Sequence, residues 1–424
     1  MEIIKYPSEE QWASLAERPV LDVAGLFDTA RQILDEVHRE GDTAVKRYEE
    51  KFDKAILSDL PVSAREWDEA EKLVSEELKQ AIRTAKRNIE KFHTCQKFKG
   101  EKIETSSGVT CWQKAVAIEK VGLYVPGGTA PLFSTVLMLG VPARIAGCRE
   151  IILCTPPDRE GKIHPAILFA AKEAGVSLVC KAGGIQAIAA MAYGTETIPK
   201  VYKIFGPGNQ YVTAAKQLVS LKDVAIDMPA GPSEVEIIAD ETANPAFIAS
   251  DFLSQAEHGA DSQAILLTTA ESLIDPVVKE ISEQLNRLPR REITEKALLN
   301  CRIILLSNRE EVIRFTNMYA PEHLIIQTTD YMEIADRIEN AGSVFLGAYT
   351  PESAGDYASG TNHTLPTNGY AKAYSGVNLD SFIRKITFQE ISRDGILGLG
   401  ETIRIMAENE QLEAHRHAVT LRMN

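Results

Sequence analysis

Apolar positions follow two different patterns along the chain. From Gly25 to about Gln96 they recur at helical spacing, as in LFDTARQILDEVHREG and in the long charged segment that ends at Gln96, which predicts amphipathic helices. After about Trp112, short apolar runs alternate with glycine turns and helical stretches. Strands and helices that alternate in this way predict mostly parallel sheets with helices on both faces.

The predicted strands form two successive groups. The first group comprises residues 121–125, 151–155, 176–181, 201–205 and 224–228, with helices predicted between them at 132–146, 165–174 and 186–193. The second group comprises residues 234–240, 264–269, 302–307, 323–329 and 343–347. We therefore expect an α/β fold of two incomplete Rossmann-like modules with mostly parallel sheets, an N-terminal arm and a C-terminal helical tail. Ligands in such sheets are expected beyond the carboxyl ends of the strands.

The same pattern divides the chain into domains. The predicted parts are an N-terminal arm at 1–24, an α/β domain built from 25–110 and 235–380 that carries the metal and acid–base candidates, an α/β domain at 111–234 that carries nucleotide-type glycine turns, and a tail at 381–424. The tail combines a strand-like stretch with amphipathic helices, so we expect it to dock onto another surface.

Composition narrows the class of protein. The 424 residues are 44% apolar and 25% charged, which is ordinary for a globular protein with large cores. A net charge of −14 argues against a nucleic-acid partner. The six cysteines are scattered without C-x-x-C pairing, and no apolar run approaches the roughly eighteen residues of a membrane span. These features predict a cytoplasmic protein with reduced thiols and no membrane partner.

Three glycine turns could approach a phosphate. They are YVPGG at 124–128, KAGGIQ at 181–186 and FGPGNQ at 205–210. Each lies between a predicted strand and a helix, where backbone N–H groups stabilise anions. None is a G-x-G-x-x-G or Walker A motif, and each alone is more often a tight turn. Together, with Tyr124, Gln186 and Asn209 available for contacts, they favour a nucleotide site.

Gln255 and His258 lie at the end of a predicted helix that begins at Pro245 and is capped by Gly259. Their spacing of three places both side chains on one helix face. In isolation, a solvated helix end is the more common reading of such a pair. Other donors strengthen the functional reading: Asp356 in a glycine-rich loop and His415 near the end of the chain.

These donors suit a transition metal. Gln255, His258, Asp356 and His415 would supply two nitrogens and two oxygens, a set compatible with zinc and poor for calcium or copper(I). Spacing alone does not establish that they converge, and His363 and His417 are competing candidates.

Glu322 and His323 form the candidate acid–base pair, after Tyr319-Ala-Pro and at the start of a predicted strand. An imidazole suits proton abstraction from an alcohol, and a carboxylate suits activation of water. In isolation, a surface glutamate beside a half-buried histidine would be the favoured reading.

Longer segments carry a family resemblance. VGLYVPGGTAPLFSTVLMLGVPA, KIFGPGNQYV, IDMPAGPSE, SQAEHGADSQ, YAPEHL, GDYASGTNHTLPT and AHRHAV occur in this order and together resemble the histidinol dehydrogenase family. The resemblance implies a zinc-dependent homodimer that oxidises L-histidinol to L-histidine through L-histidinaldehyde, with two NAD+ and one water.

The resemblance also implies roles for individual residues. Zinc would be held by Gln255, His258, Asp356 and His415, which also contact the substrate together with Ser233, His323 and Glu410. His323 would be the general base and Glu322 would activate water in the second oxidation. Tyr124, Gln186 and Asn209 would contact NAD. In the family the C-terminal segment crosses to the other subunit, so Glu410 and His415 would complete the partner's site.

Other chemistries stay open on the residues alone. A covalent route through Cys111 or Cys154 is the mechanistic rival, but neither has a basic neighbour in sequence, so packing is the expected role. Among functions, the alternatives are oxidation of another small alcohol or polyol, zinc-dependent hydrolysis, and binding of a metal or nucleotide without catalysis.

Overall fold

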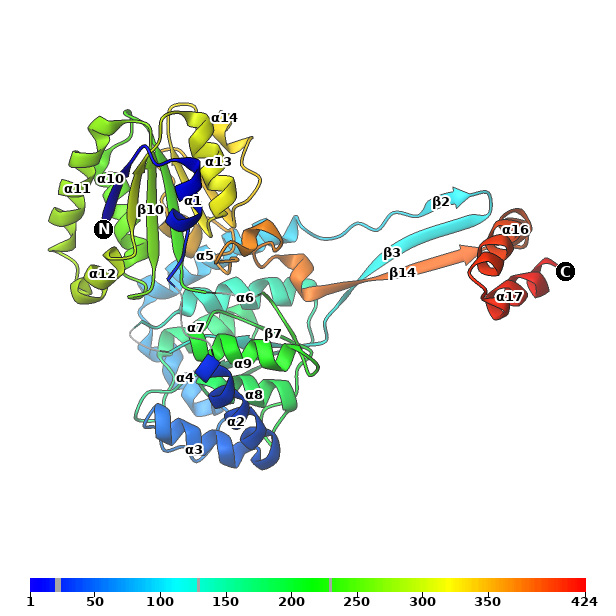
Figure 1. Ribbon diagram of the computed structural model, residues 1–424. Helices are drawn as coiled ribbons and strands as arrows, with labels where there is room; N and C mark the ends of the chain where they lie inside the picture. The colour runs from blue at the N-terminus through cyan, green and yellow to red at the C-terminus, as the bar shows by residue number, and fades with distance from the viewer. Residues whose placement is uncertain (20–23, 128–129, 229–230) are drawn as a thin grey trace.

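The computed structural model describes residues 1–19, 24–127, 130–228 and 231–424. Two α/β domains lie one above the other, and a long arm extends from them and ends in two helices (Figure 1). This architecture confirms the predicted fold class of mostly parallel sheets with a helical C-terminal region. Gly128, part of the predicted turn at 124–128, lies outside the described residues.

The first domain is built on a five-stranded parallel sheet with the order β6-β5-β4-β7-β8. Its strands are β4 (Lys120–Tyr124), β5 (Glu150–Thr155), β6 (Leu178–Lys181), β7 (Lys203–Phe205) and β8 (Ala225–Ile226). The helices between them are α6 (Phe133–Ala146), α7 (Pro165–Ala174), α8 (Gly184–Tyr193) and α9 (Gln210–Ser220). The strand order reverses between β4 and β7, which places a crevice at their carboxyl ends.

Four N-terminal helices pack against the helices of the first domain. They are α2 (Ala24–Glu40), α3 (Asp42–Phe52), α4 (Ala64–Leu73) and α5 (Glu76–Thr94). Leu34 shares a buried cluster with Ile188 of α8, and Ile89 shares another with Leu137 of α6. The prediction that residues 25–110 belong with 235–380 is therefore wrong. An amphipathic stripe shows that a helix face is buried but not which sheet buries it.

The second domain is built on a six-stranded parallel sheet with the order β1-β11-β10-β9-β12-β13. Its strands are β1 (Glu2–Lys5), β9 (Glu234–Ala239), β10 (Gln263–Thr268), β11 (Arg302–Leu305), β12 (His323–Gln327) and β13 (Ser343–Leu346). Its helices are α1 (Glu9–Leu15), α10 (Pro245–Ala256), α11 (Glu271–Leu285), α12 (Arg291–Leu298), α13 (Arg309–Tyr319), α14 (Tyr331–Ala335) and α15 (Glu352–Tyr357). The predicted N-terminal arm thus supplies an edge strand and a helix to this domain.

The arm is a three-stranded antiparallel sheet formed by segments distant in sequence. β14 (Ile383–Ile391) pairs with β3 (Val109–Ala117), which pairs with β2 (Ile103–Ser106). Helices α16 (Arg393–Asn409) and α17 (Glu413–Met423) lie at its tip (Figure 1). Short 3-10 turns at Tyr370–Lys372 and Leu379–Phe382 precede β14. Among the described residues, no helix has both the length and the apolar character needed to cross a bilayer.

A buried ion pair fixes the turn after β7. Lys216 of α9 pairs with Asp227, and the two side chains are 5% and 2% exposed. Lys216 donates to the carbonyl of Gly206 at 2.8 Å, and Asp227 accepts from the Gly206 N–H at 2.8 Å. The glycine is required here, because its φ is +122° and a Cβ would lie 2.0 Å from the carbonyl oxygen of Tyr124.

We predict that Lys216→Met destabilises the first domain by about 3–5 kcal/mol, because Asp227 is left buried without its cation. Lys279→Met is the matched control: Lys279 pairs with Glu283 one helical turn away and is 75% exposed, so its loss should cost less than about 1 kcal/mol. Urea unfolding of both variants measures the difference. Equal unfolding midpoints would show that the pair does not hold the turn.

Candidate active site

His323 lies at the amino end of β12, between β9 and the edge strand β13 of the second sheet. It is opposite Val235 of β9 and Ser343 of β13, and only 4% of its surface is exposed. The expectation that ligands sit beyond the carboxyl ends of the strands is therefore wrong for this pair. The sequence Tyr319-Ala320-Pro321 causes this placement: Ala320 has a φ of +56° and ends α13, so the chain turns directly into β12.

Helix α10 brings Gln255 and His258 to the same region. The helix ends at Ala256 and is capped by Glu257 in a right-handed conformation, so the predicted cap at Gly259 is wrong. The His258 N–H still bonds to the Gln255 carbonyl at 3.2 Å, which holds the two residues in one turn. Gln255 is fully buried, whereas His258 is exposed.

Helix α15 supplies two carboxylates, of which the sequence analysis identified only Asp356. Glu352 is four residues earlier and thus on the same helix face. Ligand atoms of His258, Glu352 and Asp356 all lie within 4.8 Å of one another. The spacing of four was the signal that could have identified Glu352. The structure therefore brings together two of the four predicted metal ligands, His258 and Asp356, and adds Glu352. Gln255 is buried one helical turn before His258.

Buried polar atoms around this cluster are left without partners. Within the described part of the chain, neither the oxygen nor the nitrogen of the Gln255 amide has a hydrogen bond, and the same holds for both oxygens of Glu352 and for Asp356 Oδ1. Leaving such atoms buried and unpaired is costly. Their chemistry, an imidazole nitrogen with amide and carboxylate oxygens, fits a divalent transition metal such as zinc.

Three carboxyl groups lie near the two ring nitrogens of His323. Its Nδ1 is 3.6 Å from Glu322 and 3.8 Å from Glu352, and its Nε2 is 3.6 Å from Asp356. Burial opposes protonation of the ring, but the nearby negative charges outweigh it and raise the pKa of His323 well above its usual value. Burial also raises the pKa of Glu352, to about 8. Three carboxyl groups beside one imidazole therefore do not all ionise readily unless a further cation joins them.

The main chain of Glu234 orients the candidate acid–base pair. Its N–H donates to Glu322 Oε2 at 2.9 Å, and its carbonyl lies 3.2 Å from His323 Nδ1. Because a carbonyl can only accept, Nδ1 carries the hydrogen of this bond and Nε2 faces the cluster. Ser233, the predicted substrate contact, immediately precedes Glu234 and is partly exposed.

The competing ligand His363 is already bonded within the protein. Its Nδ1 donates to the carbonyl of Asp356 at 2.9 Å, and its Nε2 lies 3.0 Å from Thr135 Oγ1 of α6. Asn362 donates to the carbonyl of Met138 in the same helix. This loop thus joins the two domains, and the cluster lies at their boundary. His363 therefore holds the backbone of Asp356 in place and is not one of the clustered ligand residues.

The three predicted NAD contacts have bonds within the first domain. Tyr124 accepts from the Gly184 N–H at 3.0 Å, and the Gln186 amide donates to Glu49 at 2.7 Å. Asn209 caps α9 by accepting from two backbone N–H groups. Burial raises the pKa of Glu49 to about 8. The glycine turns also serve close packing, since a Cβ on Gly127 would clash with the ring of Pro156.

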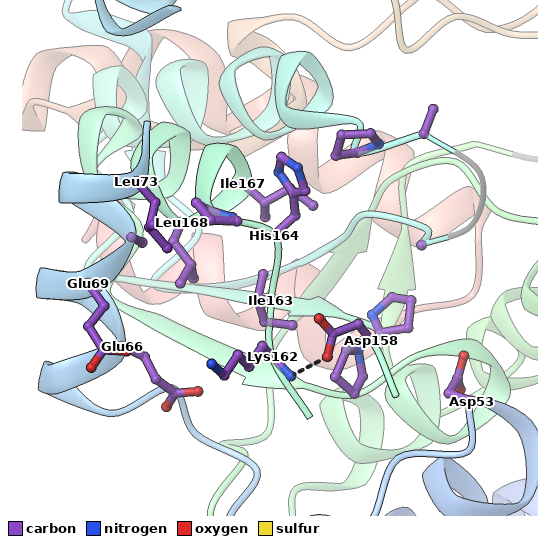
Figure 2. A pocket seen from close by; sticks show the side chains of 17 residues that line it. Asp53, Glu66, Glu69, Leu73, Asp158, Lys162, Ile163, His164, Ile167 and Leu168 are labelled. Carbon is purple, nitrogen blue, oxygen red and sulfur yellow. Dashed lines mark hydrogen bonds between the residues drawn. The ribbon is translucent and has the colours of Figure 1, made fainter. Parts of the chain in front are cut away.

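A cavity of about 460 Å³ opens beyond the carboxyl ends of β4 and β5. Figure 2 shows Asp158, Lys162 and His164 along one side, and Glu66 and Glu69 of α4 along the other. Gly127, at the end of the first glycine turn, also lines the cavity. The cavity thus lies at the carboxyl edge of the first sheet, on the β5 side of the crevice between β4 and β7.

The remaining predicted residues lie elsewhere. Glu410 and His415 are exposed on the helices at the tip of the arm, far from α10 in the same chain (Figure 1), and His417 is exposed beside them. Cys154 is fully buried in β5, where contact with Cys180 and burial raise the pKa of its thiol. Cys111 lies on β3 in the arm. Neither cysteine adjoins the cluster around His323.

Comparison with known proteins gives consistent results. The sequence profile of the family described as Histidinol dehydrogenase matches residues 16–423. The chain is 68% identical over 424 residues to histidinol dehydrogenase of Bacteroides thetaiotaomicron, covering 100% of this chain and 99% of the relative. It is 51% identical over 418 residues to the Escherichia coli enzyme, with 98% and 95% covered. The crystal structure of histidinol dehydrogenase from Elizabethkingia anophelis superposes with a TM-score of 0.98 at 56% identity, covering 100% and 98% of the two chains.

We predict that His258→Ala abolishes tight zinc binding, whereas His323→Gln retains it. His258 supplies a ligand atom to the cluster, but His323 Nδ1 is bonded to the Glu234 carbonyl. Loss of a direct ligand should weaken metal affinity by more than about 100-fold. Even loss of a residue that only hydrogen-bonds to a ligand typically weakens metal affinity about 10–100-fold. Equilibrium dialysis with zinc measures both variants. Metal loss in His323→Gln would contradict the separate roles.

Proposed function

The chain belongs to the histidinol dehydrogenase family, and from that premise we propose that it oxidises L-histidinol to L-histidine through L-histidinaldehyde with zinc and NAD+. One observation carries the proposal. His258 and Asp356, distant along the chain, lie with Glu352 in one group of ligand atoms, and Asp356 Oδ1 is 3.6 Å from Nε2 of the His323 imidazole. This arrangement supports alcohol oxidation at a metal-held substrate better than hydrolysis, because a nucleotide-type crevice lies in the adjoining domain.

In the first oxidation, His323 is the general base. With its Nδ1 hydrogen donated to the Glu234 carbonyl, the Nε2 lone pair accepts the hydroxyl proton of histidinol as hydride leaves for NAD+. When bound, zinc would hold the amino and imidazole nitrogens of histidinol and offset the negative charge of Asp356 and Glu352, which favours the neutral form of His323.

In the second oxidation, Glu322 activates the water that adds to the aldehyde. The Glu234 N–H donates to Glu322 Oε2. In the proposal, the other carboxylate oxygen, Oε1, accepts the proton from water. Burial raises the pKa of Glu322, which strengthens it as a proton acceptor. His323 then takes the proton of the hydrated aldehyde as the second hydride leaves.

The arm supports a homodimer in which each chain completes the other's site. Helices α16 and α17 pack on each other at its tip (Figure 1), and apolar side chains there are open to solvent, among them Ile405, Met406 and Leu421. A partner subunit would cover such a surface. In the proposed assembly, the arm places His415 as the fourth zinc ligand and Glu410 as a substrate contact in the partner's site.

The first domain is the proposed NAD site. The crevice at the end of β4 and the cavity in Figure 2 adjoin the glycine turns. Tyr124, Gln186 and Asn209 hold the shape of these turns, and in the proposal they also contact the dinucleotide. The start of α9, capped by Asn209, offers backbone N–H groups to a pyrophosphate.

The decisive experiment is the NADH yield. Purified protein with zinc, excess NAD+ and a limiting amount of L-histidinol should form two NADH for each histidinol, because a four-electron oxidation reduces two cofactors. Absorbance at the NADH band gives the count. One NADH would identify an alcohol dehydrogenase that stops at the aldehyde, and no NADH with hydrolysis of an ester or amide would favour the hydrolase.

We predict that Asn209→Asp raises the KM for NAD+ roughly tenfold, because a carboxylate retains the helix cap but repels a pyrophosphate. The KM for histidinol should be unchanged. Asn244→Asp is the matched control, since Asn244 caps α10 in the same way in the second domain. Steady-state kinetics test both variants, and an equal KM for NAD+ in the two would remove Asn209 from the cofactor site.

A further inference from the structure

Arg18 forms a bidentate ion pair with the carboxylate of Glu234. Its Nε donates to Glu234 Oε1 at 3.1 Å and its Nη2 donates to Oε2 at 2.8 Å. The side chains are 14% and 2% exposed. Arg18 follows α1, outside every segment that the sequence analysis connected with chemistry. Two parallel bonds fix the orientation of both groups in a way that a single point charge does not.

The same guanidinium also contacts the turn that leads into β12. Nη2 donates to the Tyr319 carbonyl at 2.8 Å, and the guanidinium lies 3.9 Å from the centre of the Tyr319 ring. Tyr319 is the last residue of α13, three residues before Glu322. Arg18 thus connects the start of β9 with the turn that delivers the acid–base pair.

Glu234 transmits this constraint through its backbone. Its side chain is held by Arg18 and by the Asn368 N–H. Its own N–H is bonded to Glu322 and its carbonyl to His323. A displacement of Glu234 would disturb both hydrogen bonds, because its N–H and its carbonyl flank the same Cα.

A contribution to folding stability is a poor explanation for the Arg18–Glu234 ion pair. A buried ion pair is often no more stabilising than apolar side chains of the same volume. The Arg18–Glu234 pair instead fixes an orientation. Its two hydrogen bonds hold Glu234, and the backbone groups of Glu234 hold the side chains of Glu322 and His323. We propose that Arg18 is a positioning residue for both oxidations, acting through Glu234 on the acid–base pair. The inference rests on the roles proposed above for Glu322 and His323.

Arg18→Lys tests the geometry, because it retains the charge but cannot form the bidentate ion pair. The kcat should fall about tenfold, since an ångström of misplacement can cost up to about 100-fold. The KM for histidinol and the zinc content should change less than about twofold, because Arg18 touches neither the substrate-facing Nε2 nor the ligand cluster.

Arg302→Lys is the matched control. Arg302 also holds the N-terminal segment, donating to the carbonyls of Leu15 at 2.8 Å and Glu17 at 3.1 Å, but it has no bond to Glu234. Its kcat should therefore stay within about twofold of the unaltered protein. An equal loss of kcat in the two variants would assign Arg18 to docking of the segment alone and overturn the inference.

A double-mutant cycle separates the pair from independent effects. Arg18→Met and Glu234→Gln each remove the bidentate ion pair, so the double variant should have a kcat no lower than the worse single variant. If the fold-reduction in kcat of the double variant equals the product of the two single reductions, the two residues act independently. Unchanged kcat in Arg18→Lys would also refute the inference.

Hydrogen–deuterium exchange provides a readout without turnover. Peptides that cover Glu234 should exchange faster in Arg18→Lys and at the normal rate in Arg302→Lys, because the Glu234 N–H loses its fixed acceptor. Failure of the unaltered protein to form NADH from histidinol would refute the proposed function. Normal exchange at Glu234 in Arg18→Lys would refute the positioning role, whatever the reaction.

Discussion

The site depends on negative charge buried around one imidazole. Glu322 and Glu352 lie 3.6 and 3.8 Å from His323 Nδ1, and Asp356 lies 3.6 Å from Nε2. Burial raises the pKa of both glutamates, whereas at Asp356 the nearby imidazoles outweigh burial and lower the pKa. One protonated ring cannot balance three carboxylates. A divalent cation at the neighbouring ligands would resolve the imbalance, and the unpaired amide of Gln255 points to the same solution.

Several separate segments meet to create this arrangement. Helix α10 supplies Gln255 and His258, the turn after α13 supplies Glu322 and His323, and α15 supplies Glu352 and Asp356. The loop after α15 is tied to α6 of the first domain through His363 and Asn362. The candidate metal ligands of the second domain therefore lie at the boundary with the first domain.

The arm has the opposite character. Its sheet and helices contact little of their own chain, and they expose apolar side chains that a stable globular surface would bury (Figure 1). The strand-like pattern at 382–392 indicated one strand, yet β14 pairs with β3, more than 250 positions earlier in the sequence. The resulting antiparallel sheet holds the terminal helices away from the two domains (Figure 1).

Local patterns were enough to determine much of this protein. The change from helical spacing to alternating strands and helices determined two parallel α/β modules, and the ordered motifs determined the family and the candidate residues, including Gln255, His258 and Asp356. Tertiary structure decided the rest. The helices at 24–94 pack against the helices of the first domain, and the candidate acid–base pair lies at the amino ends of the strands. Glu352 lies 3.8 Å from His323, and Arg18 binds Glu234, whose backbone holds both members of the pair. The physical reason is that periodicity records which face of an element is buried, whereas the partner that buries it, and the side chains that packing brings together, are set only when distant segments meet.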